Sequence, residues 1–140
     1  MDALIWSKVH GAMTHFPIAF APCAAVFDAA GMLCPRKRWS RHFHAVSAWL
    51  ISIAAAASVP AIVSGLVMTK GQMLGHGVLR LHHLFVWPAF AFLIGAAAWR
   101  WFSGARVWES AGFVYSALIW LSVGCVLTAA YWGGEMMIAA

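Results

Sequence analysis

The chain has 140 residues and a mean hydropathy of +0.82, with 64% hydrophobic and only 9% charged residues. A soluble domain of this size carries about a quarter charged residues to cover its surface, so the composition excludes an ordinary soluble domain and indicates a membrane protein. The formal net charge is +5, but the basic residues fall between apolar runs and form no basic stripe. This pattern excludes a nucleic-acid surface and favours a role in membrane topology.

Four apolar runs are each long enough for the roughly 20 residues that a helix needs to cross a bilayer. They cover residues 12–33, 45–68, 81–101 and 111–138. The connections between them are short, so successive helices should be antiparallel neighbours. The sequence therefore predicts an all-α fold, a four-transmembrane-helix antiparallel bundle that forms one domain over residues 1–140. No internal repeat is evident from the residues.

The basic residues predict the orientation of this bundle. Most of them lie in the first and third connections: Arg36, Lys37, Arg38, Arg41, Arg100 and Arg106. Cytoplasmic connections of membrane proteins are enriched in Lys and Arg. We therefore expect these connections in the cytoplasm and both termini on the outer, periplasmic side of a bacterial inner membrane.

Histidines gather at the predicted outer end of the bundle. His10 and His15 open the first run, and His76, His82 and His83 lead into the third. Because a bilayer penalises ionisable groups, such residues are functional candidates. The alternative for each of them is an interfacial residue without a functional role, since the membrane interface also solvates imidazole well.

Neighbouring small residues predict which histidines point inward. Stripes of small residues mark helix contacts in membranes, and His15 shares such a stripe with Gly11 and Ala19. We therefore expect His15 inside the bundle and His10 at the lipid headgroups. On the third run, small residues continue the helix face of His82, which favours an inward position for its side chain. Bulky residues continue the face of His83, which favours a side chain that faces lipid or an edge of the bundle. Both histidines remain candidate ligands, because the aromatic face that carries His83 could also line a cofactor.

Two imidazoles that face each other across a bundle can fill both axial positions of a haem, which favours electron transfer over oxygen chemistry. The first and third helices run the same way, so their histidines should reach a similar depth. The sequence contains no CxxCH, which excludes covalent c-type haem. The predicted haem b site comprises metal ligands His15 and His82 or His83, Lys70 and Arg80 near the propionates, and Gly11 and Gly65 leaving room for the ring.

The sequence thus predicts a small b-type cytochrome-like subunit that passes electrons between a quinone in the lipid bilayer and a redox partner on the outer face. So short a chain has little room for substrate chemistry, so we expect a subunit of a larger membrane redox complex rather than a stand-alone enzyme. A second hypothesis is a cofactor-free membrane anchor or scaffold. A third is copper handling, because soft thioether ligands suit Cu(I) and several methionines share the histidine-rich end: Met13, Met68, Met73, Met136 and Met137.

One acidic residue, Asp28, lies in the inner half of the first run. A carboxyl group at that depth requires a partner. We expect it to pair across the bundle with His42, His44 or Arg100 as a structural contact rather than a proton relay.

The segment from His10 to Ala19 reads H-x4-HFPIA and resembles the opening motif of a family of bacterial predicted membrane proteins, a domain of unknown function. Other marks of that family are present along nearly the whole chain: Asp28, Gly65, His82 or His83, Gly133 and Gly134. Members typically continue past the paired glycine to a histidine, which is missing here, so the resemblance does not extend to a ligand from the fourth helix. The family implies four helices and no established activity.

Overall fold

The computed structural model describes residues 2–34, 36–104 and 106–138. These residues form five helices, four of which are long and apolar enough to cross a membrane. The helices are α1 (Asp2–Leu33), α2 (Lys37–Met68), α3 (Gly77–Ser103), α4 (Arg106–Ser110) and α5 (Gly112–Ile138). The predicted fold class, an antiparallel bundle of four membrane-spanning helices, is confirmed.

Three of the long helices begin before the apolar runs that predicted them, whereas α5 matches its run to within one residue. Prolines lie inside three of them (Pro17 and Pro22 in α1, Pro60 in α2, Pro88 in α3) without ending the helix. Membrane helices tolerate such prolines when neighbouring helices pack against them. The third connection contains a helix that the sequence had not predicted. This short α4 is anchored by Val107, whose side chain is fully buried against the bundle.

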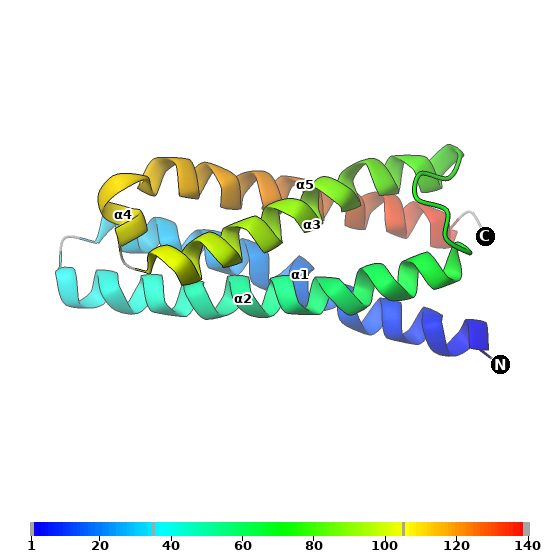
Figure 1. Cartoon of the computed structure of the whole chain (residues 1–140), viewed down its shortest axis with the longest axis horizontal. Helices are drawn as coiled ribbons and strands as arrows, with labels where there is room; N and C mark the ends of the chain where they lie inside the picture. The colour runs from blue at the N-terminus through cyan, green and yellow to red at the C-terminus, as the bar shows by residue number, and fades with distance from the viewer. Residues whose placement is uncertain (1, 35, 105, 139–140) are drawn as a thin grey trace.

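The four long helices form a ring in which α1 contacts α2 and α5, and α3 contacts α5 and α2. Both chain ends and the segment between α2 and α3 lie at one end of the bundle (Figure 1). The turn between α1 and α2 lies at the other end, together with α4. We call these the outer and the inner end after the predicted orientation, which itself stays a prediction.

Small residues make up most of the core. Alanines from all four long helices are buried, and Ile51, Leu93 and Ile119 fill the space between them. Large apolar side chains instead point away from the bundle: Trp49, Phe102 and Phe113 are exposed by 63%, 84% and 85%. Small residues let helix backbones approach closely, and lipid rather than water suits the exposed apolar surface.

The two halves of the chain repeat one another. Every buried position of α5 has a counterpart in α2 at a constant offset of 68 residues, so that Ser47 corresponds to Tyr115 and Ala61 to Ala129. Buried positions of α3 likewise follow those of α1 at an offset of 72, which pairs Asp28 with Arg100. The hairpins α1–α2 and α3–α5 therefore share one pattern of buried positions, and they contact each other through the pairs α1–α5 and α2–α3. The sequence-based expectation of no repeat is wrong.

Candidate functional site: a histidine pair at the outer end

Two histidines occupy equivalent positions at the outer end. The ring Nδ1 of His10 on α1 lies 2.9 Å from the carbonyl oxygen of Ala61 on α2, and that of His82 on α3 lies 2.7 Å from the carbonyl oxygen of Ala129 on α5. A carbonyl oxygen only accepts, so Nδ1–H donates in both rings. Nε2 of each ring takes no part in this hydrogen bond and can serve another partner.

Each ring also rests on a glycine one turn beyond its carbonyl partner. A Cβ atom at Gly65 would lie 3.1 Å from Cε1 of His10, and one at Gly133 would lie 3.4 Å from Cε1 of His82. The repeat therefore extends to the support of the two side chains. An added Cβ would crowd His10 at Gly65, whereas at Gly133 it would make only an ordinary van der Waals contact with His82.

The two rings belong to one electrostatic cluster. His82 lies within electrostatic range of both His10 and His83, and the His82 and His83 ring centroids are 5.7 Å apart. His83 is only 6% exposed, and its Nδ1 has no hydrogen-bond partner among the described residues. The backbone of Leu74 lies within hydrogen-bonding reach of the His83 ring, in keeping with the rule that a buried polar group has a partner.

The expected orientations of three histidines are wrong. His15 is exposed and bonds through Nδ1 to the carbonyl of Gly11 on its own helix, whereas His10 reaches across to α2. His83 is buried instead of facing lipid. Alanine-rich α1 carries several small-residue stripes, and the one that faces the core contains Ala21, Ala24 and Ala25. The inward position of His82 was predicted correctly.

The other predicted site residues lie at the same end. Lys70 is exposed with a positive φ of 53°, and Arg80 is exposed in the first turn of α3. A side chain at Gly11 would meet nothing within 4 Å, whereas Gly65 lies beneath His10. Across the described ranges no three His, Cys, Asp or Glu side chains converge as a metal site. The outer end therefore offers a pair of imidazoles, not a larger ligand set.

A second polar cluster lies at the inner end. Nδ1 of His44 is 2.8 Å from Oδ1 of Asp28, so the predicted partner of that carboxyl group is confirmed for His44. The guanidinium of Arg100 donates to the His44 carbonyl at 2.6 Å and lies 5.0 Å from the Trp108 ring centroid. The sequence had not indicated Trp108 or Tyr115 as members of this cluster. Only the folding of α4 against the bundle brings Trp108 to it.

These observations define a four-helix membrane protein with a duplicated hairpin and polar clusters at both ends. The model of one protein family, described as "Predicted membrane protein (DUF2231)", matches residues 7–139, and the chain belongs to that family. No curated protein matches the chain, and no solved structure does.

Proposed function

We propose that this protein is a small b-type cytochrome-like membrane subunit whose haem is held between His10 and His82. Electrons would pass between a quinone in the bilayer and a redox partner at the outer face. Bis-imidazole haem supplies reversible one-electron transfer and leaves no iron position open for substrate.

The observation that carries the proposal is the shared orientation of the two histidines. Histidines that bind metals almost always donate the other ring N–H to a carbonyl or carboxylate, which fixes the tautomer and the direction of the ring. His10 and His82 both do so with backbone carbonyls of a neighbouring helix. They come from equivalent positions of two hairpins, so they present Nε2 at the same depth.

The surroundings of the pair support the same proposal. Lys70 and Arg80 lie exposed at this end and can pair with propionates. On α1, His15 remains the alternative ligand predicted from the sequence.

The absorption spectrum of the purified protein, with metal analysis, tests the proposal. We expect one non-covalent haem per chain and a reduced-minus-oxidised change in the Soret and α bands. A colourless protein that contains copper would instead support copper handling. A colourless, metal-free protein, purified from cells supplied with haem precursors, would support the scaffold hypothesis.

A further inference from the structure

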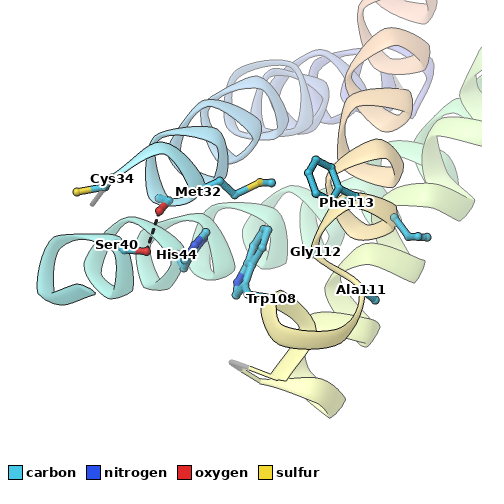
Figure 2. A pocket seen from close by; sticks show the side chains of 10 residues that line it. Met32, Cys34, Ser40, His44, Trp108, Ala111, Gly112 and Phe113 are labelled. Carbon is cyan, nitrogen blue, oxygen red and sulfur yellow. Dashed lines mark hydrogen bonds between the residues drawn. The ribbon is translucent and has the colours of Figure 1, made fainter. Parts of the chain in front are cut away.

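A cavity of about 640 Å³ opens at the inner end, between the α1–α2 turn and the start of α5 (Figure 2). Small-molecule sites fall in the range of about 300–1,000 Å³. Gly31, Met32, Ser40, His44, Trp108 and Phe113 are among its lining residues. These residues lie where the long helices end, so in a bilayer that the helices span we expect the cavity near the boundary between apolar chains and polar headgroups.

His44 is the polar group fixed most firmly in this cavity. Its ring stacks on Trp108 with the centroids 3.9 Å apart and 20° between the planes. On α1, a Cβ at Gly31 would lie 2.6 Å from Cε1 of His44, so only glycine leaves room for the ring. Nδ1 is held by Asp28, which is 1% exposed. Nε2 is therefore the hydrogen-bonding atom that His44 can offer to a bound molecule.

The buried groups around His44 have opposite charges and unused polar atoms. Oδ2 of Asp28, one guanidinium nitrogen of Arg100, Nε1 of Trp108 and the Tyr115 hydroxyl have no hydrogen-bond partner in the described part of the chain. Asp28 and Arg100 carry opposite formal charges, and none of the described residues that line the cavity is Lys, Arg, Asp or Glu. The site therefore favours a neutral ligand over an ion.

The cavity walls favour a flat ring on an apolar chain. Trp108 and Phe113 supply aromatic surfaces, which prefer offset or edge contacts with another ring. Phe113 and Met32 are exposed by 85% and 39% at the lipid-facing side. A molecule entering from the bilayer would pass these apolar side chains before its head reached His44.

We propose that the inner cavity binds the head of a neutral amphiphile whose flat ring carries a hydroxyl group, the chemistry of a quinol. The hydroxyl donates a hydrogen bond to Nε2 of His44, and the ring lies beside Trp108. His10 and Asp28 lie on the same helix, and the rise of an α-helix puts them about 27 Å apart. This site is therefore separate from the outer histidine pair, and its test needs no haem.

Titration of the purified full-length protein with a heptyl-hydroxyquinoline N-oxide, followed by the fluorescence of the probe, tests the proposal. We expect saturable binding of one probe per chain. His44→Ala should weaken binding at least tenfold, and so should Met32→Trp, which fills the cavity without touching the Asp28–His44 bond. His42→Ala is the matched control, because His42 is exposed and bonds to the Arg38 carbonyl of its own helix.

Two results would overturn the proposal. One is that the parent protein shows no saturable binding, or that Met32→Trp binds the probe as tightly as the parent protein. This comparison remains decisive if His44→Ala does not fold. The other is that dodecanoate displaces the probe at lower concentrations than an uncharged quinol does. That result would show that the cavity selects an anion.

Discussion

At the scale of single residues, the direction of an imidazole depends on a carbonyl partner and on a glycine beneath the ring. His10 and His82 share both features at the outer end. His44 shares the glycine at the inner end but replaces the carbonyl with a carboxylate. In all three rings the partner fixes the tautomer and leaves Nε2 for another contact, so what separates the sites is the second histidine, which only the outer end supplies at an equivalent position.

The glycine beneath His10 gives the first prediction. Gly65→Ala should reduce the haem content of the purified protein at least twofold, because the new methyl group would lie 3.1 Å from the ring. Gly134→Ala is the control, since a Cβ there meets nothing within 4 Å. Pyridine haemochrome analysis of both variants measures the effect. Equal haem contents would show that the ring position does not depend on Gly65.

The inner glycine gives a prediction about stability. Gly31→Ala should destabilise the fold by about 1–3 kcal/mol, because a methyl group 2.6 Å from His44 must displace a ring that is held by Asp28 and Trp108. Gly124→Ala, where a Cβ has open space, should be neutral or stabilising by up to about 1 kcal/mol. Denaturant unfolding in detergent measures both. Matching unfolding curves for the two variants would contradict the close packing of His44.

At the scale of elements, the helical hairpin is the repeated unit. The buried positions of α2 and α5 coincide along their length, but the residues at them differ, as Ser47 and Tyr115 show. For that reason the repeat is clearer in burial than in residue identity, which is kept at a few pairs such as Ala61 and Ala129. One signal was present in the sequence: His10 precedes Asp28 by the same spacing as His82 precedes Arg100.

Co-expression of the two hairpins tests whether they are structural units. Residues 1–72 and 73–140, produced as separate chains, should assemble and co-purify, because each cut end lies in the exposed connection after α2. The division keeps Trp87 with the Met73 carbonyl to which its Nε1 donates at 2.7 Å. Pull-down through a tag on one fragment measures assembly. Failure of two membrane-inserted fragments to associate would contradict independent hairpins.

At the scale of the whole molecule, hydropathy was sufficient to predict the bundle. Long apolar runs must form helices in a bilayer, because only a helix satisfies the backbone within one segment. The direction in which single side chains point, toward the core or toward lipid, was harder to predict. In α1, small residues occur on several sides, so the stripe containing His15 and Ala19 could not be told from the core-facing one. The contribution of Trp108 depended on tertiary packing of α4, which hydropathy does not report.

The orientation in the membrane is a prediction for the whole molecule. In a variant without native cysteines, Lys37→Cys should resist an impermeant thiol reagent in intact spheroplasts, because the basic connection is expected in the cytoplasm. Met73→Cys should react at once, because Met73 is 60% exposed and belongs to the connection between α2 and α3, which lies at the opposite end (Figure 1). Labelling after permeabilisation confirms that both thiols are accessible. The reverse pattern would place both termini in the cytoplasm.

The central claim is that His10 and His82 form one haem site, and EPR spectra of histidine variants test it most directly. The parent protein should show a low-spin ferric signal typical of two imidazole ligands. His10→Ala and His82→Ala should each lose haem or convert it to a high-spin form, whereas His15→Ala, at the exposed histidine of the same helix, should keep the parent signal. A native low-spin signal in His10→Ala together with its loss in His15→Ala would contradict the account.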